Sequence, residues 1–181
     1  MTEKERDAVR EMVDSYNTDF AMQDELKVRS IKKRFLVQFG TDVRKNPQYL
    51  IQLLEAAYRE ENALDVELAL ATASMFKLFS KDYSNILLKL IETDWHFVHE
   101  SIASIFQKLK LPETVDSLHK TALSRFEYLD YDDCFALAVK CIWALGDINT
   151  DESFEKLRLL AQSDNEIIRS NAVMQLQLER D

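Results

Sequence analysis

Two stretches near the carboxyl end of the chain, "DDCFALAVKCIWALG" (residues 132–146) and "SDNEIIRSNAVMQLQ" (residues 163–177), repeat one pattern at an offset of 31 residues. The matching apolar residues lie four apart: Leu137, Cys141 and Leu145 in the first stretch, and Ile168, Ala172 and Leu176 in the second. Apolar residues at this spacing share one face of an α-helix. The repeat therefore predicts two helices that each bury one stripe.

Short polar segments mark where these helices begin and end. Asp133 and Asp164 stand at matching positions before the two apolar runs, and aspartate is a favourable N-cap residue. Gly40 and Gly146 each follow the last apolar residue of a stripe, where a left-handed C-cap is expected. We therefore predict that one helix begins after each of these aspartates. We also predict that one helix ends at each of these glycines.

The same outline recurs upstream, in stretches that begin at Leu26, Asp65 and Asp94. Between them lie further amphipathic runs, which begin at Pro47, Tyr83, Pro112 and Asp151. The chain has only 2 glycines and 2 prolines, too few for a sheet protein with tight turns. The pattern predicts an all-α protein built from two-helix repeats, because each pair needs neighbours to cover its apolar stripe.

The length of 181 residues suits a single domain, residues 1–181. A helix within residues 1–23 falls outside the repeat and has apolar residues at helical spacing: Met12, Val13, Tyr16 and Phe20. We expect this N-terminal helix to cap the exposed end of the first repeat. Residues 24–181 then hold four to five two-helix repeats, of which the last is incomplete.

The stretches "CIWALGDINTDESFEKLRLLAQSD" (residues 141–164) and "IIRSNAVMQL" (residues 167–176) resemble HEAT-like repeats of the short kind also found in phycobilin lyases. The match is good over residues 132–178, fair over 65–125 and poor before Asp24. The resemblance implies an α–α superhelix, a HEAT-like α-solenoid, whose second helices line the concave face. Such folds serve as scaffolds, inhibitors and a few enzymes, so the resemblance does not select a function.

The net charge of −9 is concentrated in the second half of the chain. Residues 1–90 hold 14 Lys and Arg against 15 Asp and Glu, whereas residues 91–181 hold 9 against 17. Such a surface repels nucleic acid and attracts a basic protein. Neither a signal peptide nor an apolar run of roughly 20 residues occurs, so we expect a cytoplasmic protein outside the membrane. Capped repeats favour a monomer.

The stretch "DWHFVHE" (residues 94–100) holds the sharpest candidate for a metal site. On a helix, His96 and His99 lie on one face with Glu100 nearby, and two imidazoles with a carboxylate can hold a metal ion. The alternatives are exposed polar residues and contact with a partner. HEAT-like deoxyhypusine hydroxylases use several His-Glu pairs, whereas this chain has one. We therefore expect no metal, no other cofactor and no catalytic activity.

The stretch "EYLDYDDC" (residues 127–134) combines aromatic and acidic side chains without a basic residue. It is interpreted either as a solvated loop or as a contact surface, since tyrosine beside carboxylates is a common way to bind a cationic protein surface. Trp95 and His96 occupy the corresponding linker one repeat earlier, so the two linkers should be neighbours in space. The candidate partner-binding residues are Trp95, His96, His99, Glu127, Tyr128, Asp130, Tyr131 and Asp132.

The basic cluster "KVRSIKKR" (residues 27–34) surrounds an apolar stripe of Val28, Ile31 and Phe35. Its five cations could contact phosphate, but the pattern is also typical of a solvated helix face with local pairing to Asp24 and Glu25. We expect the solvated face.

These features together predict a non-catalytic protein that binds a basic protein partner. Small, acidic helical-repeat proteins resemble the immunity proteins that neutralise bacterial toxins, many of which are cationic nucleases. That resemblance implies an acidic surface that steers association and masks the phosphate-binding residues of the toxin. The alternative is a general adaptor or regulatory scaffold, and a third possibility is a metal-dependent or lyase-type enzyme of HEAT-like fold.

Overall fold

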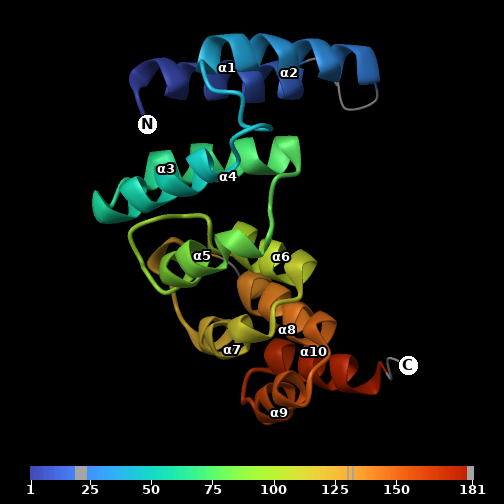
Figure 1. The fold of residues 1–181 in the computed structure, drawn as a ribbon. Coiled ribbons are helices and arrows are strands. Elements are labelled where there is room, and N and C mark those ends of the chain that lie inside the picture. Colours follow the sequence, from blue (N-terminus) through green and yellow to red (C-terminus); the bar gives the residue numbers. More distant parts are fainter. Residues whose placement is uncertain (19–23, 130, 132, 179–181) are drawn as a thin grey trace. The chain divides into compact units, whose positions relative to one another are not determined.

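The computed structural model describes residues 1–18, 24–129, 131 and 133–178. Every regular element within these residues is helical, and ten α-helices follow one another from α1 to α10 (Figure 1). This confirms the predicted all-α fold class. The chain divides into two compact units, residues 1–78 (unit 1) and residues 79–181 (unit 2).

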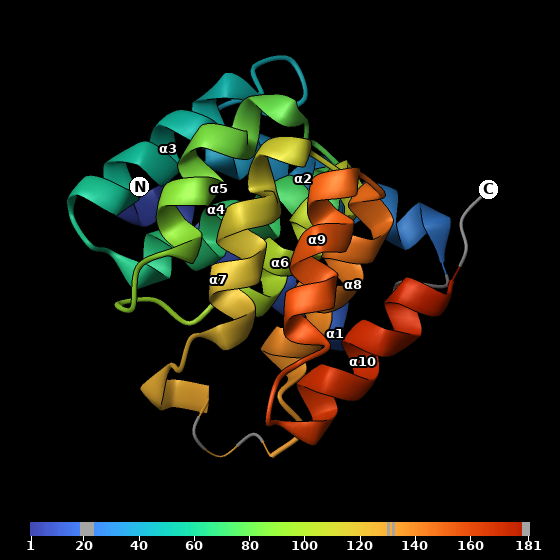
Figure 2. The ribbon, with the colours of Figure 1, turned by 90° about the horizontal axis from the view of Figure 1, so that it is seen from below.

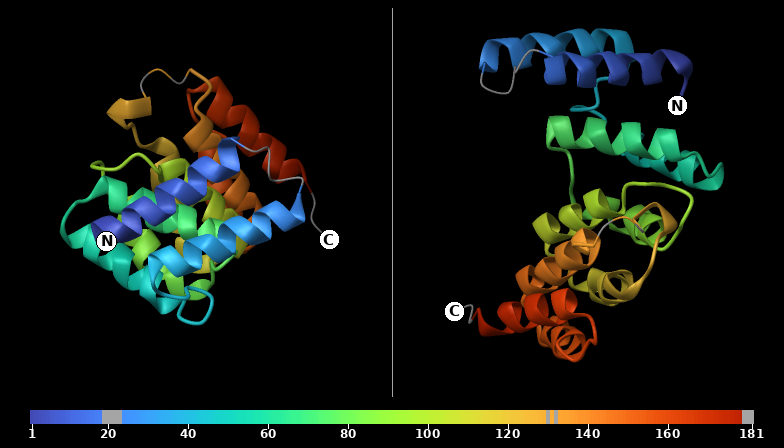
Figure 3. Two further views of the ribbon diagram at one scale, coloured as in Figure 1. Left: turned by 90° about the horizontal axis from the view of Figure 1, so that it is seen from above. Right: turned by 180° about the vertical axis from the view of Figure 1, so that it is seen from behind.

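Unit 1 consists of α1 (Glu3–Thr18), α2 (Glu25–Phe39), α3 (Gln48–Arg59) and α4 (Ala63–Phe76). α1 packs against α2 and α3 packs against α4, and α1 also contacts α4, so that the two pairs form two layers (Figure 1, Figure 3). The core between them includes Val9, Met12, Phe35 and Leu54. The predicted N-terminal helix is therefore present, and its partner in the first layer is α2.

The apolar stripe predicted for the N-terminal helix is buried only in part. Met12 is buried, whereas Val13 and Tyr16 are half-buried and Phe20 lies outside the described residues. The remaining apolar contacts of α1 come from Ala8 and Val9, one turn earlier.

A buried carboxylate, Asp65, joins the two layers of unit 1. α4 begins at Ala63, and Asn62 is its N-cap, so Asp65 lies inside the first turn and not before it. The Asp65 carboxylate accepts hydrogen bonds from the N-terminal ammonium of Met1 (2.6 Å) and from the Nε and Nη2 atoms of Arg6 (2.7 and 3.1 Å). These donors keep its charge compensated in a site that water does not reach.

Unit 2 consists of α5 (Ser84–Ile91), α6 (His99–Leu109), α7 (Val115–Leu123), α8 (Ala136–Ile148), α9 (Asp151–Leu160) and α10 (Glu166–Gln177). α8 is central and packs against α6, α7, α9 and α10 (Figure 2). The predicted stripe of Leu137, Cys141 and Leu145 is buried in these contacts. In α10, Ile168 and Ala172 are buried and Leu176 is half-buried. Five of these six predicted stripe residues are therefore confirmed as core.

The predicted N-caps are wrong by one or two residues. The N-cap of α10 is Asn165, whose Oδ1 accepts from the backbone N–H groups of Ile167 and Ile168, and not Asp164. The N-cap of α8 is Phe135, which supplies no side-chain cap, so Asp133 is not a cap either. Neighbouring Asp and Asn side chains cap equally well, and sequence spacing alone does not choose between them.

One of the two predicted glycine C-caps is confirmed. Gly40 ends α2 with a φ of +83°, the left-handed conformation that favours glycine. Gly146 instead lies inside α8, which continues to Ile148 and ends at the left-handed Asn149. Its role is close packing, because a Cβ at this position would collide with the side-chain oxygen of the buried Gln175.

The predicted start of the helix after Asp94 is also wrong. Residues 92–98 form a loop, and α6 begins only at His99. Across the described residues, none of the helices combines the length and the apolar character that a membrane span requires.

Candidate partner-binding corner

The two linkers of unit 2 that the sequence singles out meet in space. One is the loop of residues 92–98 between α5 and α6, and the other is the segment of residues 124–135 between α7 and α8. The Tyr128 hydroxyl lies 2.9 Å from Nδ1 of His99, and the rings of Phe97 and Tyr128 contact edge to face at 5.3 Å. We call the described residues of these two linkers, together with His99, the aromatic corner.

The imidazoles of His96 and His99 form the interior of the aromatic corner. Both side chains are fully buried, with ring centroids 4.3 Å apart. The ring of Phe126 covers the other side of His99 at 3.9 Å, and Trp95 meets His96 edge to face. The prediction that the two histidines share one exposed helix face is wrong, because His96 lies in the loop and His99 is the first residue of α6.

The hydrogen bonds of the two imidazoles define their tautomers. In each ring Nε2 lies near a backbone carbonyl, that of Leu90 for His96 (2.9 Å) and that of Thr93 for His99 (2.6 Å). Since a carbonyl can only accept, both Nε2 atoms carry the proton. The Nδ1 atoms then accept, from the Val98 N–H in His96 and from the Tyr128 hydroxyl in His99. Both rings are therefore neutral donors and acceptors with every nitrogen used.

Burial sets the protonation state of the aromatic corner. It lowers the pKa of His99 to about 4 and holds the pKa of His96 below its usual value of 6.5. It also raises the pKa of the Tyr128 phenol to about 12. At neutral pH, Nδ1 of His99 therefore accepts a hydrogen bond from the Tyr128 hydroxyl, which ties the second linker to the first.

These contacts argue against the proposed metal site at His96, His99 and Glu100. A metal ion would need an imidazole lone pair, and each lone pair already accepts a hydrogen bond. The Glu100 carboxylate pairs with the Lys140 ammonium at 2.6 Å. In the described part of the chain, no three His, Cys, Asp or Glu side chains converge in an arrangement suited to a metal ion.

The outer face of the aromatic corner carries exposed rings and exposed carboxylates. Phe97 is 66% exposed and Tyr131 is 82% exposed. Asp94, Glu127 and Asp133 are exposed as well. Of the predicted contact residues, Glu127 and Tyr131 face solvent, whereas Trp95 and Tyr128 are half-buried. Asp130 and Asp132 lie outside the described residues.

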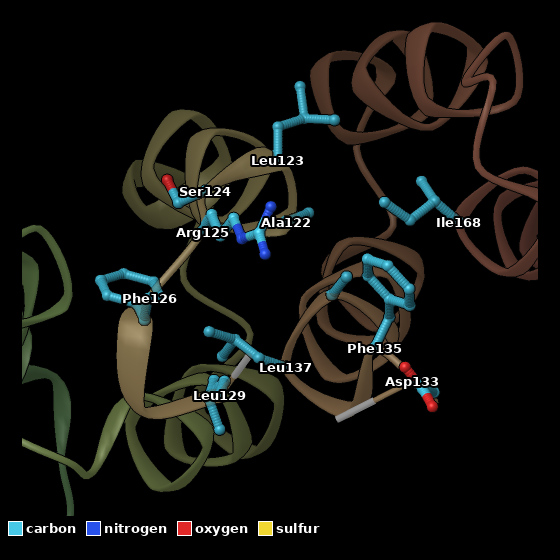
Figure 4. Close-up of a pocket in the computed structure, with 11 residues that line it drawn as sticks. Ala122, Leu123, Ser124, Arg125, Phe126, Leu129, Asp133, Phe135, Leu137 and Ile168 are labelled. Atoms are coloured by element: carbon cyan, nitrogen blue, oxygen red, sulfur yellow. The ribbon is translucent and has the colours of Figure 1, made fainter. Parts of the chain in front are cut away.

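An open cavity adjoins this outer face (Figure 4). Its volume is about 370 Å³, and its walls come from the end of α7, the linker of residues 124–135, the start of α8 and α10. Figure 4 shows Leu123, Phe135 and Ile168 around it, each from a different element. The charged residues of the lining are Arg125 and Asp133. The cavity is thus mostly apolar, with one charge of each sign.

Phe135 reaches the edge of this cavity from a strained backbone. Its φ of +51° and ψ of +43° are left-handed, a conformation that costs a residue with a side chain about 1–2 kcal/mol. The ring remains 41% exposed, so burial returns only part of this cost. Strain of this kind persists where the surrounding structure imposes it and is frequent at binding sites.

Sequence reasoning missed Phe97, Phe135 and the cavity. Both phenylalanines lie in linkers and outside the four-residue stripes, and that is the signal by which they could have been found. Comparisons with protein-family models, curated proteins and solved structures give no match for this chain.

Proposed function

We propose that this chain is a non-catalytic binding protein whose aromatic corner contacts a basic protein partner. The observation that carries the proposal is the set of exposed residues in the aromatic corner: the rings of Phe97 and Tyr131, and the carboxylates of Asp94, Glu127 and Asp133. Of these residues, Asp133 also lines the cavity. Aromatic side chains dominate the binding energy of protein interfaces, and a pocket beside them can hold an apolar side chain of the partner. Carboxylates around that centre favour a partner whose contact surface has a cationic rim.

The internal contacts of the aromatic corner support the same proposal. The exposed Phe97 ring packs on Tyr128, and Tyr128 is hydrogen-bonded to the buried His99. A preorganised surface loses less conformational entropy when a partner binds. The buried imidazoles are thus assigned a scaffold role, and the exposed rings and carboxylates are assigned the contact.

The charge of unit 2 favours a basic partner. Residues 79–181 hold 18 Asp and Glu against 11 Lys and Arg, a net charge of −7, whereas residues 1–78 hold 14 against 12, a net charge of −2. Charge of one sign accelerates encounter with a partner of the other sign, most strongly at low ionic strength.

The proposal extends to the repeat architecture and to the class of partner. We infer that the helix pairs are HEAT-like repeats of an α–α superhelix, since consecutive helices pack against each other in both units. In its most specific form, the protein is an immunity-type inhibitor that neutralises a cationic toxin such as a nuclease. A general adaptor would use the same surface.

The test is affinity capture of a partner from the native host with the full chain, followed by titration with the purified partner. Phe97→Ser with Tyr131→Ser should weaken binding by about 100-fold or more, since each ring is an exposed anchor worth about 2 kcal/mol. Glu127→Lys with Asp133→Lys should weaken it most at low salt.

Glu152→Lys with Glu155→Lys is the matched control, because it makes the same change of charge on α9, outside the aromatic corner. Capture of the same partner with equal affinity by the two corner variants and the wild type would refute the proposed site. A captured partner that is acidic would refute the proposed chemistry.

A further inference from the structure

A second concave surface lies on unit 1, between α2 and the carboxyl end of α4. Its volume is about 980 Å³, and its walls include Phe76 of α4 and Arg44 of the loop between α2 and α3. Three cations of α2, Arg29, Lys32 and Lys33, line the same surface. We call it the basic groove.

The positive charge of the basic groove is only partly compensated. Arg44 is neutralised by the Asp42 carboxylate, which it binds through Nε and Nη2 at 2.9 and 2.8 Å. The side chains of Arg29 and Lys33 are exposed. Among the described residues that line the groove, Glu25 is the one carboxylate. The groove is thus cationic although the whole chain is acidic.

Lys32 shows that positive charge is crowded here. Its ammonium lies 5.3 Å from the centre of the Phe76 ring, which covers it with an apolar face. Burial, and secondarily the positive charge of Lys77, lower the pKa of Lys32. A carboxylate placed in the groove would offset this repulsion.

Apolar side chains flank two of these cations along one face of α2. Leu26, Arg29, Lys33 and Leu36 follow one another at spacings of three and four residues, which places them on a single helix face. Leu26 is 78% exposed, and Leu36 is half-buried. An exposed leucine beside cations matches a partner that offers both apolar and acidic groups.

We propose that the basic groove binds an acidic amphipathic helix of a partner protein. Its apolar residues would lie on Leu26 and Leu36, and its carboxylates would meet Arg29 and Lys33. Helices that present residues at such spacings bind apolar grooves in this way. A nucleic acid fits less well, because its phosphates gain nothing from the leucines and the surrounding unit has more acidic than basic residues.

The direct test measures fluorescence anisotropy of a labelled helical peptide, about 15 residues long, with leucines three and four residues apart and glutamates between them. The protein is the full chain. Arg29→Glu with Lys33→Glu should weaken binding of this peptide by about 30-fold or more, because attraction becomes repulsion. Leu26→Ser should weaken it by about fivefold, since the leucine side chain is then no longer buried on binding.

Lys4→Glu with Lys27→Glu is the matched control, since both lysines are exposed and neither lines the groove. This control should keep the wild-type affinity within about twofold at physiological salt. Circular dichroism should show the same helix content for all variants, because every substituted residue is exposed.

Three results would overturn the proposal. The first is absence of peptide binding, or equal loss in the groove variant and its control. The second is tighter binding of a single-stranded oligonucleotide of equal charge, which would assign the groove to phosphate. The third is concentration-dependent self-association in sedimentation that Arg29→Glu with Lys33→Glu abolishes, which would assign the groove to a second copy of this chain.

Discussion

Unit 1 buries a charged carboxylate, Asp65, that is paired with two cations, whereas unit 2 buries two neutral imidazoles, His96 and His99. Asp65 keeps its charge because an ammonium and a guanidinium compensate it at 2.6 and 2.7 Å. The imidazoles are uncharged because the hydrogen-bond partners of their nitrogens are carbonyls, an amide and a phenol. The same burial therefore produces an ion cluster in one unit and an uncharged hydrogen-bond chain in the other.

This difference separates the two units in their response to acid. Burial raises the pKa of Asp65, but hydrogen bonds from Arg6 and the N-terminal ammonium outweigh it, so the pKa lies below 3.8. The stability that Asp65 contributes is complete above that value and is lost only as the pH falls further. The lowered pKa of His99 means that the unfolded chain takes up its proton first, so stability is lost as the pH falls from 6.5 towards 4.

The largest expected effect comes from removing the centre of the ion cluster in unit 1. Asp65→Ala leaves the guanidinium of Arg6 and the N-terminal ammonium without their buried partner, which should cost about 4 kcal/mol in free energy of unfolding. Urea unfolding followed by circular dichroism measures it. Glu3→Ala is the control, because Glu3 pairs with Arg6 at the surface and should cost less than about 1 kcal/mol. Equal losses in the two variants would contradict the assignment.

Mild acid should weaken unit 2 while unit 1 is unaffected. Between pH 6.5 and about pH 4, His99 alone should remove about 3 kcal/mol of stability from unit 2, because a shift of one pKa unit corresponds to about 1.4 kcal/mol. Both tryptophans of the chain, Trp95 and Trp143, lie in unit 2, so tryptophan fluorescence during urea unfolding reports this unit.

His99→Phe removes the proton site and keeps an aromatic ring in its place. Its unfolding midpoint should be lower at neutral pH but should change less between pH 6.5 and about pH 4 than that of the wild type. An unchanged pH dependence in this variant would show that another group titrates.

A smaller effect is expected from the bond that joins the two linkers. Tyr128→Phe deletes the hydroxyl that donates to Nδ1 of His99 and leaves a buried acceptor unsatisfied, which should cost about 1–2 kcal/mol. Tyr131→Phe, at a solvent-exposed position of the same segment, should leave the free energy of unfolding unchanged. A cost shared by both variants would mean that the bond does not hold the corner together.

The features that depend on local periodicity could be predicted from the sequence. Leu137, Cys141 and Leu145 are core residues because a spacing of four decides which face of a helix they share. Gly40 ends its helix because glycine adopts a positive φ without strain. The contact between the two linkers of unit 2 could also be inferred, from their matching places in the repeat.

The features that depend on distant partners could not be predicted. Burial keeps His99 neutral, and its ring contacts Tyr128, which comes 29 residues later in the chain. Gly146 is required by Gln175 on the next helix but one. A spacing of three between His96 and His99 is equally compatible with a helix face and with a loop that turns inward. Sequence periodicity therefore located the aromatic corner but misjudged which of its side chains reach solvent.

The smallest expected change in stability comes from two residues with a strained, left-handed backbone. We expect a binding role for one of them and not for the other. Lys77 in unit 1 and Phe135 in unit 2 share a left-handed backbone, with φ of +56° and +51°. Lys77→Gly should stabilise unit 1 by about 1 kcal/mol, because glycine adopts this conformation freely and Lys77 does not line the basic groove. Phe135→Gly should change the unfolding free energy by less than about 1 kcal/mol, since relief of strain offsets the loss of a partly buried ring, but it should abolish capture of the basic partner. Retained capture by Phe135→Gly would show that the strained ring takes no part in binding and that the two units do not differ in this respect.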